Sequence, residues 1–366
     1  MEDHLLQLFF MLLRSGLWER DIEDVSSFPL TETQWMDIYD CAYKQKVSAV
    51  VFRGINHLPD ELMPPQKQLV RWMVEVDAVE RRNQQMNAAL ANLYSGITFK
   101  GYTAFLLKGQ GLALNYAVPM SRDCGDIDLY FSSEKEGCSF AELVASKGAQ
   151  VEKKSDRSLC YTWRGVMVEQ HPEMLDLQTP SVKRYLKKLC MEEAGDSYFI
   201  QPNLAVKLPS PLLNLVLQNS HILKHALGRG VGLRQLCDIA RSYYAFKGRV
   251  DGKRVYEVYR KAGLLKWSAL LHTFLVNDLG LAADLLPYPQ NHHLSSQPLK
   301  DIVLKGGNFG LYGKSSPNME SPKWKRKWDT FNSFFRNTSF AMRYAPREAV
   351  WTVLNLIRGT LCSRKI

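Results

Sequence analysis

The sequence has no cysteine pattern that would support a zinc ribbon or a disulfide scaffold. Its 366 residues include seven cysteines, an odd number, and no two of them form a Cys-x-x-Cys pair. Structural zinc sites need closely spaced ligands, and disulfide-stabilised domains need many cysteines in a short chain. The scattered thiols suit a reducing compartment, so we expect the protein to be cytoplasmic.

Long hydrophobic runs are also missing. An apolar stretch at residues 5–13 follows Glu2 and Asp3 rather than a basic segment, and no small-residue cleavage site follows it before Arg14. These flanks predict a core helix rather than a signal peptide. The stretch is also shorter than the roughly 18–20 apolar residues that span a bilayer, so we expect no transmembrane helix.

Acidic residues are fewer than basic ones. The chain carries 47 Lys and Arg against 37 Asp and Glu, a formal net charge of +10. Such an excess favours an anionic partner, which leaves a nucleotide, a nucleic acid and an acidic membrane surface open. The length predicts two or three modules, and 46% hydrophobic residues are ample for a buried core.

The chain divides by pattern into three regions. Residues 1–100 are expected to be helical, with a capping box at residues 31–34 opening one helix. Residues 101–210 mix strands and helices. Residues 211–366 return to helical spacing, interrupted by a long loop at about residues 285–322 that is rich in Pro, Gly, Asn, His and Ser. We therefore predict an α+β protein with a small mixed-sheet core between N- and C-terminal helical regions.

The middle region has short apolar runs of strand length. Residues 103–107 predict a strand, followed by a helix at about residues 110–116. Residues 126–131 alternate acidic and apolar side chains, the period of a second strand, and a helix follows at about residues 134–147. Residues 159–163 and 166–169 predict a hairpin.

The second strand carries two acids at alternate positions. In a strand, Asp126 and Asp128 point to the same face, roughly 6.5–7 Å apart, while Ile127 enters the core. Two adjacent carboxylates repel each other, and a divalent cation such as Mg²⁺ removes that conflict. The alternative is a solvated strand face without any metal.

Residues on either side of these acids suit phosphate and metal chemistry. A strand that runs into Lys108-Gly109 and then a helix places backbone N–H groups where a phosphate can dock. Arg122, in the loop before the acids, could reach the same phosphate. Glu169, on a strand expected beside the acids, could supply a third carboxylate that holds a metal and helps to deprotonate a hydroxyl. Each of these residues could equally be an ordinary turn or surface residue.

Three histidines and one basic segment leave more than one interpretation open. His171 shares the face of Glu169 if the strand continues; it is either a ligand or, as we favour, a packed polar residue. His221 and His225 have metal-binding spacing on a predicted helix, but a packing role fits better because no third ligand is evident. Residues 323–336 mix Lys and Arg with Trp and Phe, which suits a membrane surface, RNA or an ordinary amphipathic helix.

These motifs together resemble a known family. Residues 105–109, Arg122, residues 125–129 and residues 168–171 are similar to the uncharacterised nucleotidyltransferase family of bacterial proteins, within the polymerase-beta-like nucleotidyltransferase superfamily. The resemblance extends over roughly residues 30 to 315. It implies that Asp126, Asp128 and Glu169 bind two Mg²⁺ ions, and that the protein moves a nucleoside monophosphate from a nucleoside triphosphate, such as ATP, to an unknown hydroxyl acceptor.

One departure from the superfamily pattern concerns the phosphate turn. Lys108-Gly109-Gln110 stands where the superfamily has a Gly-Ser pair, so no serine hydroxyl is present at this turn. Gly109 takes the place of the glycine, and Gln110 or Lys108 is the candidate substitute for the serine in nucleotide binding. The missing serine keeps a non-catalytic nucleotide-binding or regulatory protein as the alternative to an enzyme.

Overall fold

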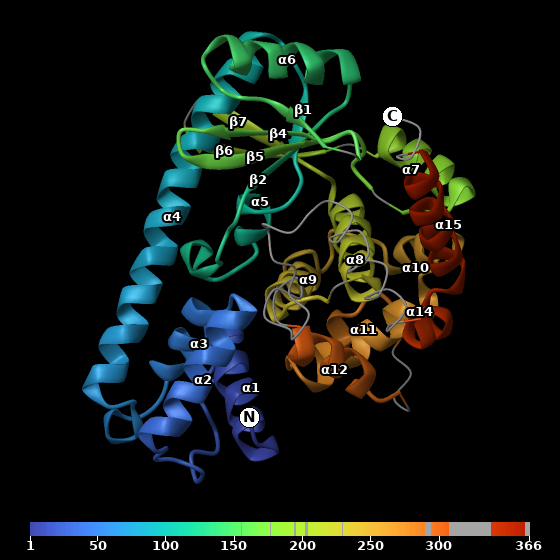
Figure 1. The fold of residues 1–366 in the computed structure, drawn as a ribbon. Coiled ribbons are helices and arrows are strands. Elements are labelled where there is room, and N and C mark those ends of the chain that lie inside the picture. The colour runs from blue at the N-terminus through green and yellow to red at the C-terminus, as the bar shows by residue number, and fades with distance from the viewer. Residues whose placement is uncertain are drawn as a thin grey trace.

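The computed structural model describes residues 1–154, 156–175, 177–193, 195–201, 204–228, 230–289, 294–306 and 338–362. The chain begins with a helical region whose last helix is also its longest. Helix α4 runs from this region along one side of the molecule to the sheet (Figure 1). The expected capping box is present, because the Thr31 side chain accepts from the backbone N–H of Gln34 and the Gln34 side chain accepts from that of Thr31. The elements are α1 (Asp3–Trp18), α2 (Glu32–Gln45), α3 (Ser48–Ile55), η1 (Asp60–Leu62) and α4 (Gln66–Phe99).

A seven-stranded mixed sheet forms the centre of the fold, in the order β3-β4-β5-β2-β1-β7-β6. Strand β2 lies between β5, which is parallel to it, and β1, which is antiparallel. The expected hairpin is β4–β5, and a second hairpin, β6–β7, extends the sheet on the other side of β1. The strands are β1 (Ala104–Leu106), β2 (Ile127–Phe131), β3 (Glu152–Lys153), β4 (Leu159–Trp163), β5 (Val166–His171), β6 (Asp196–Gln201) and β7 (Leu204–Leu208).

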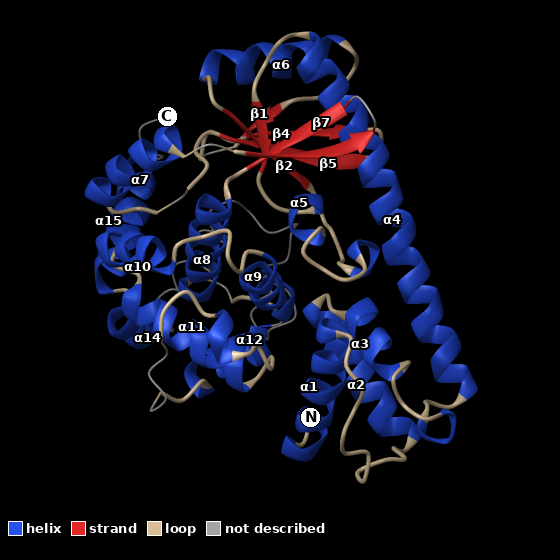
Figure 2. Cartoon of the chain, turned by 180° about the vertical axis from the view of Figure 1, so that it is seen from behind, coloured by secondary structure: helices blue, strands red, loops and turns tan. Residues whose placement is uncertain are grey.

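Helices cover the sheet on one face and leave the other face to the site. Helix α6 lies across the sheet (Figure 2). Its Phe140 packs with apolar residues of β2 and of the second half of α4 in one core cluster. The helix expected at residues 134–147 is therefore present, whereas the one expected at 110–116 is a single turn, α5. The remaining elements of this region are α5 (Gln110–Ala113), η2 (Pro119–Ser121), α6 (Glu134–Ser146) and α7 (Pro180–Glu192).

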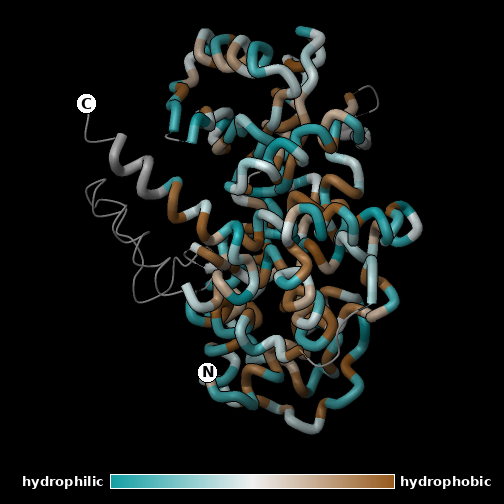
Figure 3. The backbone as a smooth tube through the Cα atoms, turned by 90° about the vertical axis from the view of Figure 1, so that its right-hand side faces the viewer, coloured by the Kyte–Doolittle hydropathy of each residue, from teal (hydrophilic) through white to brown (hydrophobic). Residues whose placement is uncertain are grey.

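The C-terminal helices pack with the N-terminal ones around a second core cluster. The Phe10 ring of α1 meets Phe274 of α11 edge to face, and Trp18 donates a 2.6 Å hydrogen bond to the carbonyl of Leu279. Hydrophobic and hydrophilic residues alternate along these helices, as amphipathic packing requires (Figure 3). The elements are α8 (Pro211–Leu227), α9 (Leu233–Ala245), α10 (Gly252–Ala262), α11 (Leu265–Asn277), η3 (Ala283–Leu285), α12 (Gln297–Gly306), α14 (Thr338–Tyr344) and α15 (Pro346–Cys362).

The expectation of an uninterrupted loop at residues 285–322 is wrong for part of that interval. Helix α12 lies inside it, and Leu299 and Val303, one helical turn apart, are fully buried in the helical core. Two apolar positions are enough to dock a short helix, although the surrounding Pro, His and Ser dominate the composition. The basic and aromatic residues 323–336 lie outside the described residues.

Within the described residues, no helix has the length and hydrophobicity needed to cross a membrane. Six cysteines of the described part of the chain are free thiols: Cys41, Cys124, Cys138, Cys160, Cys190 and Cys237.

Candidate active site

Strands β2 and β5 bring two carboxylates side by side. Asp128 of β2 is in register with Glu169 of β5, so the two side chains project from adjacent parallel strands on the same face of the sheet. Ile127 and Leu129, which flank Asp128, are fully buried on the opposite face. The alternation of acidic and apolar residues thus positions the acids, and Glu169 lies on the neighbouring strand as the sequence indicated.

Asp128 is buried and has two cationic or polar partners. Its Oδ1 lies 3.0 Å from Nζ of Lys108 and 2.6 Å from Nε2 of His171. Burial by itself raises the pKa of this carboxyl, but the Lys108 ammonium and the His171 hydrogen bond outweigh burial and hold the pKa well below its usual range. Asp128 is therefore a carboxylate at neutral pH.

The residues able to share one metal ion include His171. Among the described residues, one ligand atom each from Asp128, Glu169 and His171 lie within 4.8 Å of one another. Glu169 also pairs with Lys154, whose Nζ lies 3.2 Å from its Oε2. The sequence favoured a packing role for His171, but its place two residues after Glu169 on β5 puts both side chains on the site's face.

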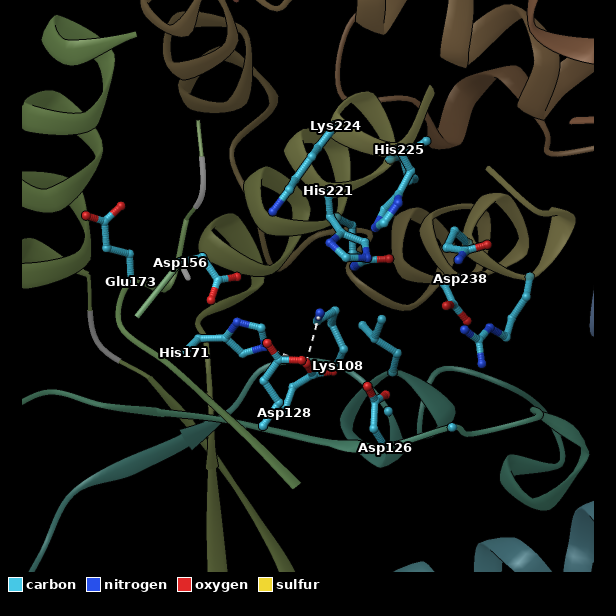
Figure 4. Close-up of a pocket in the computed structure, with 18 of the residues that line it drawn as sticks. Lys108, Asp126, Asp128, Asp156, His171, Glu173, His221, Lys224, His225 and Asp238 are labelled. Carbon is cyan, nitrogen blue, oxygen red and sulfur yellow. Dashed lines mark hydrogen bonds and ion pairs between the residues drawn. The ribbon is translucent and has the colours of Figure 1, made fainter. Parts of the chain in front are cut away.

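Asp126 lies just before β2 and stands apart from this group of three. Its pKa is raised, chiefly by the nearby charge of Asp128 and then by burial, while Lys108 and Arg234 act in the opposite direction. Its carboxylate lines the same cavity as Asp128 (Figure 4). The two acids therefore do repel each other across the site, as their spacing indicated.

The turn at Gly109 directs Lys108 and Gln110, the two candidate substitutes for the missing serine, into different cavities. Gly109 has φ +57° and ψ −121°, and a side chain there would come within 3.1 Å of the Asp126 carbonyl, so glycine is required. Lys108 lines the acidic cavity. Gln110 is buried and lines a different cavity, next to α4, where its side-chain nitrogen and oxygen have no hydrogen-bond partner among the described residues.

Arg122, which was expected to reach a phosphate from its loop, is buried and forms an ion pair with Asp238. Its Nε and Nη2 each donate a 2.8 Å hydrogen bond to the Asp238 carboxylate on α9, and Nη1 lies 3.2 Å from Sγ of Cys124. The hydroxyl of Tyr116 donates to the same carboxylate. The guanidinium is at the wall of the cavity, but its hydrogen-bonding edges are directed to protein groups.

Helix α8 forms the wall opposite the carboxylates. The cavity has a volume of about 680 Å³, and His221, Lys224 and His225 of α8 line it across from Asp126 and Asp128 (Figure 4). Their spacing of three and four residues places them on one helix face. Burial lowers the pKa of His221 most, and the positive charge of Lys108 lowers it further. This wall is basic, while the opposite wall is acidic.

The α8 histidines do not form a metal site of their own within the described residues. The rings of His221 and His225 contact each other edge to face, with centroids 4.5 Å apart. Neither belongs to the metal-capable group found among those residues. Their face of α8, together with Lys224 and with Arg234 of α9, was not predicted as part of the site, because the sequence does not reveal which helix lies over the sheet.

The site thus combines a mixed sheet that carries in-register acids, a glycine turn beside them, and a helix that faces them. The chain belongs to the uncharacterised nucleotidyltransferase family, whose model matches residues 31–278. A crystal structure of an antigenic nucleotidyltransferase-like protein from Paracoccidioides brasiliensis is similar to this chain at 15% identity and a TM-score of 0.37. The match covers 54% of this chain and 93% of that protein. No curated protein matches the chain.

Proposed function

We propose that this protein transfers a nucleoside monophosphate from a nucleoside triphosphate to a hydroxyl acceptor in a metal-dependent reaction. Family membership supports the class of reaction. The observation that carries the proposal is the register of Asp128 with Glu169 on adjacent strands, with the Lys108 ammonium 3.0 Å from Asp128. Acids for a metal and a cation for a phosphate thus meet in one cavity.

The donor set fits a divalent cation. Asp128 and Glu169 offer carboxylate oxygens, and Asp126 lies beside them. Mg²⁺ prefers oxygen ligands and is commonly bound by one or two carboxylates together with substrate phosphates. His171 offers an imidazole nitrogen, which suits Zn²⁺ better than Mg²⁺. We assign two Mg²⁺ ions to the three carboxylates and give His171 the role of orienting Asp128. Bound there, the ions supply positive charge for the triphosphate and lower the pKa of the acceptor hydroxyl.

The phosphate-binding residues come from two walls of the cavity. Lys108 and the backbone of Gly109 lie at the turn, and Lys224 and the two histidines of α8 face them. Cations on both sides can hold a triphosphate without the serine that the superfamily places at this turn. Gln110 does not line this cavity, so we assign the function of that serine to Lys108 and α8. For Arg122 we propose that it positions the loop before Asp126 through its pair with Asp238.

The reaction that these residues support is an in-line displacement at the α-phosphate. The acceptor oxygen forms a bond to the α-phosphorus, the bond from that phosphorus to the bridging oxygen breaks, and pyrophosphate leaves with the electron pair. Glu169 takes the proton of the acceptor hydroxyl, which is the role of a general base. Lys108 and Lys224 balance the charge of the departing pyrophosphate.

Transfer of label from nucleotide tests this proposal directly. The purified protein is incubated with each α-labelled nucleoside triphosphate and Mg²⁺, with and without cell extract, beside the Asp126→Asn/Asp128→Asn variant. We expect label to move to an acceptor with the wild-type protein, and the rate to fall at least ~100-fold in the variant. Equal transfer by the two proteins contradicts the assignment of these acids.

The alternative is a protein that binds nucleotide without turning it over. It is favoured by one observation: the Lys108 ammonium lies 3.0 Å from Asp128, where it competes with the metal ion that catalysis needs. Mg²⁺-dependent nucleotide binding without transfer, lost in the same variant, would support this regulatory function over catalysis.

A further inference from the structure

A second cavity adjoins the site on the side away from α8. Its volume is about 410 Å³, and it lies between the ends of β2 and β5 and helix α7. Five residues line both cavities: Arg157, His171, Pro172, Glu173 and Lys183. Because His171 is 2.6 Å from Asp128, the second cavity begins one side chain away from the carboxylates.

The shared wall is held by ion pairs. Glu173 lies between Arg157, at 3.6 Å from Nη2, and Lys183, at 3.2 Å from Nζ. The side chain of Arg157 is 62% exposed, that of Lys183 35% and that of Glu173 40%. All three therefore remain accessible to a ligand in either cavity. Arg157 comes from the loop between β3 and β4 and Lys183 from α7, so the wall joins two elements at the opening between the cavities.

The two cavities differ in charge. The first is balanced, with six Lys or Arg and six carboxylates among its lining residues. The second has an excess of cations among the described residues that line it, where Glu134 and Glu173 are the acids opposite five basic residues. Those five are Lys153, Arg157, Lys183, Arg184 and Lys187. A cavity with this excess favours an anionic ligand without the help of a metal.

The floor of the second cavity is apolar. Phe131, Met174 and Leu186 line it and are at most 6% exposed, and Tyr130 lies beside them. A basic rim over an apolar floor matches a molecule with an apolar body and one anionic group. The anionic group then meets the basic residues, and the apolar body meets the apolar residues. A nucleoside triphosphate has its charge concentrated in the phosphates, which the first cavity already accommodates.

We propose that the second cavity is the acceptor subsite, and that the acceptor is a hydroxyl compound with an apolar body and a phosphate or carboxylate group. This inference rests on the proposed function, since it assigns the acceptor of that same reaction. The anionic group pairs with Arg184 and Lys187 of α7, and the apolar body lies against Leu186 and Phe131. The hydroxyl then points past His171 toward Glu169.

Small anions that mimic this acceptor test the proposal. Binding of phenyl phosphate and benzoate to the full-length protein is measured by titration calorimetry. Phenol, which lacks the anionic group, and inorganic phosphate, which lacks the apolar ring, are the comparators. We expect phenyl phosphate or benzoate to bind at least ~10-fold more tightly than either comparator. The better of the two shows whether a phosphate or a carboxylate is preferred.

Variants on α7 decide where the probe binds. Arg184→Gln/Lys187→Gln, which changes only the second cavity, should weaken phenyl phosphate binding ~10-fold or more. Lys188→Gln is the matched control, because Lys188 is on the same helix, 74% exposed, and does not line the cavity. Equal binding by the double variant and the wild type, or displacement of the probe by Mg²⁺ and ATP, overturns the proposal.

A separate measurement distinguishes this failure from failure of the proposed function. Mg²⁺-dependent ATP binding is compared in the wild type and in Arg184→Gln/Lys187→Gln, and we expect the two values to agree within ~3-fold. Loss of probe binding with ATP binding retained supports a distinct subsite. Absence of ATP binding in the wild type contradicts the proposed function, whereas unchanged probe binding in the variant contradicts the subsite alone.

Discussion

Lys108 is the residue whose role is most open to a direct test. Its ammonium lies 3.0 Å from Oδ1 of Asp128, so a metal ion must share or replace this contact. We expect Lys108→Gln to bind Mn²⁺ alone at least about 10-fold more tightly, since a competing charged hydrogen bond is worth about 1.5–3 kcal/mol. The same variant should bind ATP about 10-fold more weakly, because a phosphate partner is lost. Calorimetric titrations with each ligand measure both effects.

Lys154→Gln is the control for that prediction. Lys154 pairs with Glu169 at 3.2 Å, but its side chain is 46% exposed, and exposed ion pairs contribute little. We therefore expect a change of less than about 3-fold in Mn²⁺ affinity. If Lys108→Gln behaves like Lys154→Gln, Lys108 does not compete with the metal, and its assignment to the phosphate also loses support.

The sequence predicted the candidate acids better than their partners. Asp126, Asp128 and Glu169 were identifiable because alternation along a strand and proximity of strands are local properties. The contact of Lys108 with Asp128 depends on how the turn after β1 meets β2. Lys224 reaches the cavity of Asp128 from α8, although it lies more than 90 residues after Asp128 in the sequence. Alternation and spacing do not reveal such a distant contact.

At the scale of elements, the Arg122–Asp238 pair joins the loop before β2 to α9. Both side chains are about 5% exposed or less, and the guanidinium makes two hydrogen bonds to the carboxylate. We expect Asp238→Asn to lower the free energy of unfolding by about 3–5 kcal/mol, because it leaves a buried cation uncompensated. Urea denaturation measures this loss.

A double variant controls for the change in packing. Arg122→Met/Asp238→Leu removes both charges and should be less destabilised than Asp238→Asn alone. A loss below about 1 kcal/mol in Asp238→Asn means that Arg122 is not held by the pair. That result would restore the direct phosphate role that its place in the sequence indicated.

Elements formed by local pattern were predictable, and those formed by distant pairing were not. The β4–β5 hairpin and α6 follow from adjacent runs and from the spacing of apolar residues. The β6–β7 hairpin was not anticipated, and β7 joins the sheet by pairing in parallel with β1, about 100 residues earlier. Helix α12 was missed because, among its described residues, Leu299 and Val303 alone are fully buried.

At the scale of the whole molecule, the described residues form two cores, and the boundary between these cores does not follow the order of the sequence. The N- and C-terminal helices share one cluster, whereas the second half of α4 belongs to the cluster of the sheet. Helix α4 therefore links the two cores, with Trp72 in the first and Leu90 in the second. The site lies where the sheet faces α8, so its geometry depends on both cores being folded.

The helical core contains a histidine that makes its stability depend on pH. His272 of α11 is fully buried, and its Nε2 lies 2.9 Å from the hydroxyl of Tyr243. His272 contacts the side chains of Tyr243 and Tyr288, which are phenols; burial raises their pKa values, so they stay neutral in acid. Burial lowers the pKa of His272 to about 3. Folding thus disfavours the protonated form of this residue.

Acidification should therefore weaken the fold through His272 between pH 6.5 and about 3. In that window the unfolded chain binds the proton and the folded chain does not, so the free energy of unfolding falls by about 1.4 kcal/mol per pH unit. We expect the wild type to lose about 2 kcal/mol more than His272→Gln between pH 6.5 and 5, measured by urea denaturation at each pH. Above pH 7.5 their difference should be constant, because His272 is then neutral in both states. Parallel losses in the two proteins across the acidic window would mean that the buried imidazole accepts its proton without unfolding the helical core.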